Sequence, residues 1–321
     1  MRINSIARAG IATVAILALT ISSANAEVDL PCRSVKLIVP WGAGGGTDVV
    51  FRTFAEEVNK QGANPKLQVV NVPGQSGNKG SKAFLNEEAN GCALLAIHQS
   101  VITSYLNGQV DYTWDAFTPV ARLTSTSSFV GASKNTPFED IPGMVKFAKA
   151  NPAKLVAASS LGSTSHFLML MIEEDAGIEF KHVSYDGTRE RLTALLAGNV
   201  DLAEVNLTSA SQSIETGDLK VLAITTEKRN ETLHEIKTLR ENNMDIVYAT
   251  ERGIALPKGT SSEIVAYYEA MFEKAAKSPA LIESLNAMGT DVHFVNSSTY
   301  KIQLSDTFNV WENLAKKVGI L

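Results

Sequence analysis

The chain has 321 residues, of which 45% are hydrophobic and 20% charged, and its formal net charge is −5. This length exceeds what one hydrophobic core usually fills, so we expect two domains. The average composition argues against disorder, collagen, coiled coil and solenoid repeats, and the acidic balance gives no electrostatic basis for binding nucleic acid.

Residues 1–26 have the pattern of a secretory signal peptide. Arg2 and Arg8 precede an apolar stretch from Ala9 to Ile21, and the segment ends in Ala24-Asn25-Ala26, a small-x-small cleavage pattern. The apolar stretch is too short to span a membrane. We expect cleavage after Ala26, a soluble mature protein in the periplasm, and no lipid anchor, because Glu27 rather than Cys follows the cut.

Export makes a disulfide between the two cysteines possible, because an oxidising compartment permits disulfides. Cys32 lies just before one apolar strand and Cys92 opens another. If these strands are parallel neighbours, both cysteines lie at the same end of the sheet, close enough to bridge. Two small buried apolar side chains are the alternative.

Strands alternate with helices along the first part of the mature chain. Continuous apolar runs predict strands, and apolar residues at helical spacing predict helices between them. This alternation is typical of an α/β fold with parallel-dominated mixed sheets. The expected elements are strand 35–40, helix 47–61, strand 67–72, helix 79–88 and strand 92–97.

The middle of the chain repeats this scheme between two extended stretches, 119–133 and 246–256. These stretches predict two crossovers between lobes, one lobe comprising residues 27–130 with 249–321 and the other residues 131–248. Two crossovers define a hinge, around which the lobes can close on a ligand. The expected elements are helix 137–150, strand 155–159, helix 164–176, strand 181–185, helix 188–197 and strand 200–205, followed by helices from about 261 to 286 and from 299 to 317.

A glycine cluster follows the first strand, in KLIVPWGAGGGTD. Glycines permit a sharp turn, and the helix that follows presents free N–H groups and a partial positive charge to an anion. The run lacks the Lys of a P-loop and the ribose-binding acid of a dinucleotide site, so a carboxylate fits better. No Lys or Arg occurs between Val39 and Phe51, so Gly45→Val is expected to weaken binding through steric block and a strained backbone.

A second loop, SLGSTSHF, follows the strand at 155–159 and precedes another helix. Its glycine, hydroxyls and helix N-terminus offer a second anion-binding surface. The two loops are expected to face each other across a cleft, at the carboxyl ends of their sheets. Simple helix capping is the alternative interpretation, and His166 fits either a packed residue or a ligand contact.

The sequence resembles the extracytoplasmic solute-binding receptors of tripartite tricarboxylate transporters, also called Bug-type receptors. Seven segments in the same order carry the resemblance: KLIVPWGAGGGTD, NVPGQSGNKGSKAF, DAFTPVARL, the block from AKANPAKL to VSYDGT, ALLAGNVDLAEVN, GDLKVLAITTEKR and IALPKGTSSEIV. The resemblance implies a Venus-flytrap fold that grips a ligand carboxylate between its lobes. It also implies delivery of a di-, tri- or aromatic carboxylate to membrane permease subunits.

The family pattern assigns ligand contacts to both loops and to neighbouring strand ends. Residues carried over from the two loops are Trp41, Gly44, Gly45, Gly46, Thr47 and Asp48, and Ser160, Gly162, Ser163, Thr164, Ser165 and His166. Strand ends expected to face the cleft add Gln99, Asn206 and Thr208.

Two segments depart from the family pattern. The family usually has Pro-Tyr-Lys-Gly where this chain has Ser184 and Asp186 around Tyr185, which changes the shape and charge of that rim. Arg252 stands where an aromatic residue is common. It either pairs with a second, distal carboxylate of the ligand or is a solvated hinge residue.

Other functions fit the sequence less well. An exported serine hydrolase is suggested by Ser163 and His166, but position 165 holds Ser where a nucleophile elbow needs Gly. The five histidines have no metal-ligand spacing, so neither a metal nor a cofactor is expected. We expect a monomeric, non-enzymatic binding protein. A receptor that reports to a sensor kinase would share every feature of this sequence.

Overall fold

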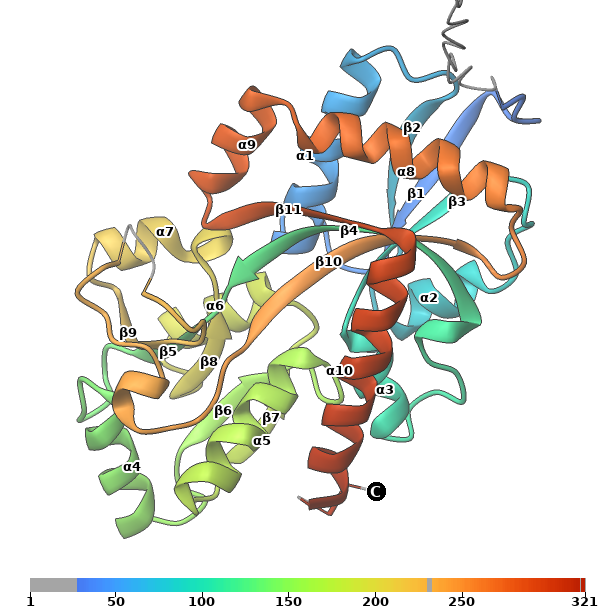
Figure 1. Ribbon diagram of the computed structural model, residues 1–321. Coiled ribbons are helices and arrows are strands. Elements are labelled where there is room, and N and C mark those ends of the chain that lie inside the picture. The colour runs from blue at the N-terminus through green and yellow to red at the C-terminus, as the bar shows by residue number, and fades with distance from the viewer. Residues whose placement is uncertain (1–27, 230–232, 318, 321) are drawn as a thin grey trace, which may run out of the picture.

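The computed structural model describes residues 28–229, 233–317 and 319–320. The predicted signal peptide and its cleavage site lie outside these residues. Among the described residues, no helix combines the length and apolar character needed to cross a membrane. Two β-sheets with helices on their faces form the molecule, and Figure 1 shows them one above the other.

The first sheet has six described strands and contains both the beginning and the end of the chain. Its parallel half begins at β1, which pairs with β2 and β3, while β10 and β11 run antiparallel to their neighbours. The strand order is β11 (Thr290–Asn296), β4 (Phe117–Ser127), β10 (Ala249–Pro257), β3 (Ala93–His98), β1 (Ser34–Val39) and β2 (Lys66–Asn71).

The second sheet has five described strands, all from the middle of the chain. β6 pairs in parallel with β7 and β8, whereas β5 pairs antiparallel with β8 and β9. The strand order is β7 (Lys181–Ser184), β6 (Val156–Ser159), β8 (Leu202–Val205), β5 (Phe129–Ser133) and β9 (Leu219–Ile224).

The prediction of mixed α/β sheets is confirmed, but parallel pairs do not dominate. Among the described strands, the first sheet has two parallel and three antiparallel pairings, and the second has two of each. The connecting strands β4, β5 and β10 cause this difference. They pass between the sheets without a crossover helix, so they pair antiparallel with the strands beside them.

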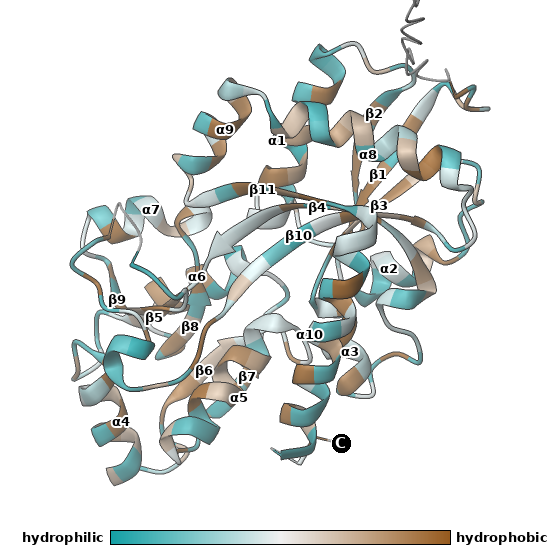
Figure 2. Cartoon of the chain, in the orientation of Figure 1, coloured by the Kyte–Doolittle hydropathy of each residue, from teal (hydrophilic) through white to brown (hydrophobic). Residues whose placement is uncertain are grey.

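The helices follow the strands closely in sequence. Figure 2 shows brown, hydrophobic residues along the strands of both sheets, and teal, hydrophilic residues alternating with brown ones along the helices. The helices are α1 (Gly46–Lys60), α2 (Asn78–Phe84), α3 (Ser100–Leu106), α4 (Ile141–Ala150), α5 (Thr164–Ala176), α6 (Thr188–Leu196), α7 (Leu207–Glu215), α8 (Ser262–Ala276), α9 (Pro279–Asn286) and α10 (Ser297–Lys317), with short 3₁₀ turns at Gln75–Gly77, Trp114–Ala116 and Arg240–Asn242.

The chain passes between the sheets at two places. β4 runs into β5 through the single residue Ser128, and the return runs from β9 through the 3₁₀ turn Arg240–Asn242 into β10. Hydrogen bonds from Thr225 join these two passages: its N–H and its hydroxyl both donate to the Ser128 carbonyl, at 3.0 and 2.9 Å, and the Tyr248 N–H donates to the Thr225 carbonyl. The passages therefore lie side by side, as a hinge requires.

The C-terminal helix α10 connects the two halves of the molecule in a second way. It begins directly after β11 of the first sheet and runs past α3 to α5, which follows β6 of the second sheet (Figure 1). Trp311 of α10 stacks on Phe167 of α5 with ring centroids 5.7 Å apart. One apolar cluster accordingly includes residues of both halves.

Cys32 and Cys92 form a disulfide, with their Cα atoms 5.9 Å apart. The two residues lie just before the starts of β1 and β3, which are parallel neighbours. The bridge therefore joins two segments at the same end of the first sheet.

Candidate functional site

Four helix N-termini lie where the two sheets face each other. α1, α5, α6 and α7 each begin a few residues after a strand of a parallel pair, namely β1, β6, β7 and β8. Parallel strands end at one edge of their sheet, so the helices that follow them start together. Free N–H groups and the helix dipoles make this region favourable for an anion.

Two small adjoining cavities lie among these helix ends, and both include Trp41, Thr47, Gly187 and Thr188 in their walls. The first cavity, of about 40 Å³, is lined by Trp41, Thr47, His98, Ser160, Ser163, Thr164, Ser165, Gly187, Thr188, Arg191, Glu204, Asn206, Thr250 and Arg252. The second cavity, of about 30 Å³, is lined by Trp41, Gly42, Gly45, Gly46, Thr47, Gly187, Thr188, Arg189 and Glu190.

Hydrogen-bond donors from both sheets converge at Gly46, the first residue of α1. A Cβ placed on Gly46 would lie 3.3 Å from Asn206 Nδ2 and 3.4 Å from Arg252 Nη2. The Asn206 Oδ1 already accepts from the Ser209 N–H as the cap of α7, at 3.1 Å, so its Nδ2 is the group that faces Gly46. Glycine therefore leaves room at a point where two side-chain donors meet a helix N-terminus.

Arg252 is a buried cation without a carboxylate partner among the described residues, and only 3% of it is exposed. Its Nε donates to Thr47 Oγ1 at 3.1 Å and its Nη1 to Thr126 Oγ1 at 2.5 Å, while Nη2 donates to no described residue. Burial lowers the pKa of Arg252 to about 10, so it remains protonated at neutral pH. The alternative of a solvated hinge residue is therefore wrong, and the hydrogen bond to Thr47 places Arg252 at the start of α1.

Arg191, the second buried arginine of the first cavity, is already paired. Its Nη2 donates to Glu204 Oε2 at 2.5 Å, and its Nη1 to Ser160 Oγ at 3.0 Å. The other oxygen of Glu204 accepts from Ser128 Oγ at 2.7 Å, in the first passage between the sheets. Both charged groups of this pair are therefore satisfied, so Arg252 carries the charge that is left over in the first cavity.

Trp41 and His98 form one wall of the site, with ring centroids 5.0 Å apart and nearly parallel planes. The Ser100 N–H donates to His98 Nδ1 at 3.2 Å. Burial, reinforced by Arg252 and Arg191, lowers the pKa of His98 to about 3, so the ring is neutral at physiological pH. The buried Trp41 Nε1 has no hydrogen-bond partner among the described residues.

The Asp48 side chain stabilises the conformation of the first glycine loop through hydrogen bonds. Its carboxylate accepts from the Gly44 N–H at 2.8 Å, from Arg52 Nε at 2.9 Å and from Asn71 Nδ2 at 2.7 Å. Burial would raise the pKa of Asp48, but these hydrogen bonds outweigh it and the pKa is lowered. Asp48 therefore holds the loop and lines neither cavity.

The strained glycine of this loop is Gly44, not Gly45. Gly44 has φ of 76°, in the left-handed region, whereas Gly45 has φ of −78° as the N-cap of α1. The expected backbone penalty of Gly45→Val therefore does not apply. A Cβ at Gly45 would lie 3.3 Å from the Gly42 carbonyl oxygen, so only crowding remains.

The second loop contributes through the N-terminus of α5. Ser163 is its N-cap and makes no side-chain cap bond, and its Oγ lies 3.1 Å from Ser165 Oγ. His166 Nδ1 accepts from the Gly162 N–H at 3.3 Å, and its ring packs against His182. The Ser163–His166 contact that a hydrolase would need is therefore not formed.

The structure brings most of the sequence-predicted residues together. The cavities are lined by Trp41, Gly45, Gly46, Thr47, Ser160, Ser163, Thr164, Ser165, Asn206 and Arg252. The remaining predicted contacts lie outside both linings: Gly44, Asp48, Gln99, Gly162, His166 and Thr208.

Those residues outside the cavities have structural partners. The Gln99 amide bridges β3 to β10 by donating to the Ala249 carbonyl and accepting from the Glu251 N–H. Thr208 Oγ1 donates to the Met288 carbonyl at 2.9 Å, near the start of β11. Both residues follow a strand end and therefore lie near the site. The Gln99 side chain, however, bonds to the backbone of β10 in the same sheet, and the Thr208 side chain bonds to the backbone of the other lobe.

Sequence reasoning missed several residues that line the cavities. Gly187 and Thr188 form a third strand-to-helix loop after β7, the same pattern that identified the other two loops, and α6 adds Arg191 one turn later. His98 is the last residue of β3. Glu204 lies inside the buried strand β8, where no local signal distinguishes it.

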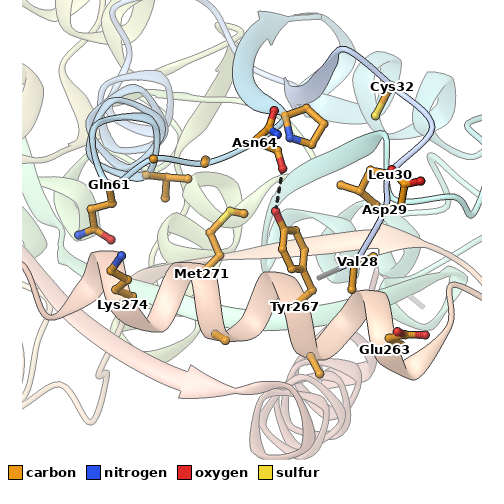
Figure 3. Close-up of a pocket in the computed structure, with 16 residues that line it drawn as sticks. Val28, Asp29, Leu30, Cys32, Gln61, Asn64, Glu263, Tyr267, Met271 and Lys274 are labelled. Atoms are coloured by element: carbon orange, nitrogen blue, oxygen red, sulfur yellow. Dashed lines mark hydrogen bonds between the residues drawn. The ribbon is translucent and has the colours of Figure 1, made fainter. Parts of the chain in front are cut away.

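A larger cavity, of about 1180 Å³, lies elsewhere, between the end of α1 and α8. Figure 3 shows Tyr267 and Met271 of α8 in its wall, with Tyr267 Oη donating to the Asn64 carbonyl. None of its lining residues belongs to the N-terminal turn of α1, α5, α6 or α7. Within the described residues, no group of three His, Cys, Asp or Glu side chains could hold a metal ion.

Comparison with known proteins gives matches along the whole chain. A UPF0065 protein in the gbd 5′ region of Cupriavidus necator is 30% identical, and the match covers 99% of this chain and 98% of that protein. The periplasmic binding protein BugD has the same fold, with a TM-score of 0.83, 25% identity and coverage of 89% and 98%. An R. palustris protein solved with adipate has a TM-score of 0.82, 25% identity and coverage of 91% and 99%.

These likenesses confirm the two-lobed fold of periplasmic binding proteins that the sequence predicted. A family model described as "Tripartite tricarboxylate transporter family receptor" matches residues 50–320, which include the second loop of the site and every described strand except β1, while the first glycine loop lies before the matched residues. The family is one of receptors, and the neighbour BugD is a periplasmic binding protein. The chain belongs to the tripartite tricarboxylate transporter receptor family.

Proposed function

We propose that this protein is a periplasmic receptor that closes its two lobes around a small carboxylated molecule and delivers it to a tripartite tricarboxylate-type permease. The convergence at Gly46 carries the proposal: Arg252 Nη2 and Asn206 Nδ2, from the first cavity, meet the N-terminus of α1 where the two cavities adjoin. A carboxylate there would receive one charge-assisted bond and several from neutral N–H groups. The neighbour solved with adipate, a carboxylate, supports the ligand class.

The first experiment is a thermal-shift screen of mono-, di-, tri- and aromatic carboxylates, followed by calorimetry of each hit against its amide. Ligand at 100 times its dissociation constant should stabilise the protein by about 2.7 kcal/mol. The acid should bind and its amide should not, with weak dependence on salt because the contacts are short-range and enclosed. Equal affinity of acid and amide would remove the carboxylate from the proposal.

Delivery to a permease needs its own test. Uptake of the identified ligand into vesicles that contain the permease subunits should depend on this receptor. A receptor that signals to a sensor kinase would bind the same ligand without supporting uptake. Permease genes or a kinase gene beside the receptor gene separate these two outputs.

The proposal includes export and hinge closure. We propose cleavage after Ala26 and a monomeric mature protein, which mass spectrometry and size-exclusion chromatography test. The sequence predicted lobes of residues 27–130 with 249–321 and of residues 131–248. We propose these two lobes with one change: the first boundary lies at Ser128, between β4 and β5. Spin labels on α8 and α4 should move relative to each other on ligand binding, and labels within one lobe should not.

A further inference from the structure

The charged side chains that line the two cavities sum to different net charges, and this difference bears on how many negative charges the ligand carries. In the first cavity, Arg191 and Glu204 neutralise each other at 2.5 Å, and Arg252 adds one positive charge. His98 there is neutral, because its pKa is about 3. The first cavity therefore has a formal charge of one positive unit.

The second cavity has no leftover positive charge. Arg189 and Glu190 lie in its wall, and both are exposed. The Glu190 carboxylate faces the first glycine loop: a Cβ on Gly42 would lie 3.6 Å from its Oε1. A ligand group in this cavity meets one charge of each sign.

Acids in the first turns of the helices beside the second cavity weaken the positive ends of the helix dipoles there. The helices that begin beside it are α1 and α6, and each has an acid in its first turn, Asp48 and Glu190. An acid at that position offsets the partial positive charge of a helix N-terminus, but Asp48 is paired with Arg52 at 2.9 Å, so Glu190 is the acid that acts on the second cavity. α5, whose N-terminal residues line the first cavity, has no acid in its first turn.

We propose that the site selects a monocarboxylate: Arg252 is the counter-ion for one carboxylate in the first cavity, and Glu190 disfavours a second carboxylate in the other. This proposal rests on the proposed function and narrows its ligand class. A second carboxylate in the second cavity would meet the like charge of Glu190, and Arg189 is the cation of the same lining that opposes this effect.

Isosteric acid pairs test the proposal on the unmodified protein. Malonate, succinate and adipate differ from malonamate, succinamate and adipamate by one charge and almost nothing in shape. For the pair whose length fits, calorimetry at low salt should show the monoamide binding about tenfold more tightly than the diacid. Lowering the pH from about 8 to about 5, where carboxyl groups begin to protonate, should narrow that gap.

The outcomes separate this proposal from the proposed function. If no acid or monoamide binds, the proposed function itself fails. If a diacid binds as tightly as its monoamide or more tightly, the receptor function stands and selection of a monocarboxylate is overturned.

Substitutions of Glu190 and of Arg252, each with a control, test the role of each residue in ligand selection. Glu190→Gln should bring the diacid within about threefold of its monoamide, an effect that salt should reduce because the side chain is exposed. Glu179→Gln, an exposed site outside both cavities, removes the same charge and should leave the gap unchanged. An unchanged gap in Glu190→Gln would remove Glu190 from the proposal.

Arg252→Gln should weaken the monocarboxylate by tenfold or more, and Arg252→Lys should recover part of that loss. Lys277, the C-cap of α8, has a side chain that is 73% exposed, so Lys277→Gln is the matched loss of positive charge and should bind normally. Thermal melts of each variant verify folding. Normal binding by folded Arg252→Gln would show that Arg252 is not the counter-ion.

Discussion

Single residues set the shape of the first glycine loop, and Gly44 is the one whose backbone needs glycine. Its φ of 76° and the Arg189 Nη1 atom 2.8 Å from a Cβ placed there both oppose a side chain. We expect Gly44→Ala to lower the free energy of unfolding by about 1–2 kcal/mol, the usual penalty of the left-handed region. Urea denaturation measures this change.

Gly45→Ala is the matched control, because Gly45 has φ of −78°. Its unfolding free energy should stay within about 0.5 kcal/mol of the parent. Equal destabilisation by both substitutions would contradict the assignment of strain to Gly44.

At the same scale, Asp48 links the loop to pH. Its hydrogen bonds hold its pKa below the ordinary value despite burial, so its stabilising effect is complete above the unfolded pKa and is lost as pH falls through the folded pKa. Asp48→Asn should cost about 1.5–3 kcal/mol at neutral pH. Below about pH 4, the gap in unfolding free energy between parent and variant should shrink. A gap that stays constant from neutral to acid pH would show that the charge of Asp48 is irrelevant.

At the scale of elements, α10 acts as a brace between the halves of the molecule. Trp311 is buried against Phe167 of α5, and Lys317 Nζ pairs with Glu174 Oε1 at 2.7 Å. The exposed ion pair contributes little, so the stacked rings should carry the energy of this contact. Trp311→Ala is expected to lower the free energy of unfolding by about 3–5 kcal/mol.

The neighbouring Val310 provides the control for α10, since 63% of it is exposed. Val310→Ala should change the unfolding free energy by no more than about 0.5 kcal/mol. A small effect of Trp311→Ala, measured in the same denaturation series, would show that α10 rests on α5 without bracing it.

At the scale of the whole molecule, hydrogen bonds connect the two lobes directly beside the site. The Ser76 N–H donates to Asp186 Oδ1 at 3.0 Å, and Ser76 Oγ donates to the Leu161 carbonyl at 2.8 Å. Ser76 has φ of 58°, a conformation that costs a non-glycine residue about 1 kcal/mol or more. These bonds join the rim where the sequence departs from its family to the 3₁₀ turn Gln75–Gly77.

Asp186→Ala should therefore speed ligand release without unfolding either lobe. Loss of one hydrogen bond of about 1 kcal/mol corresponds to a roughly fivefold faster dissociation rate. Stopped-flow fluorescence of the tryptophans measures that rate. Asp218→Ala, which removes an exposed ion pair with Lys134 inside one lobe, should leave the rate unchanged. An unchanged rate in Asp186→Ala would exclude this contact from closure.

The sequence by itself determined the features that depend on local chemistry. Alternating apolar runs predicted most strands and helices, including α5 at Thr164–Ala176, and glycine and hydroxyl loops predicted two of the helix N-termini at the site. Local signals suffice here because hydrophobic periodicity and capping act over a few residues.

Tertiary structure alone decided which groups meet. Nothing local shows that Arg252 reaches Thr47, 205 residues away, while Arg191 is neutralised by Glu204. The same limit explains why Gln99, Thr208 and Asp48 were expected to line the site but bond elsewhere. A strand end fixes where a residue lies, whereas the direction and partner of its side chain depend on the strand, helix or lobe that packs against it. Charge balance in a cavity is a property of that assembly, so only the folded chain reveals it.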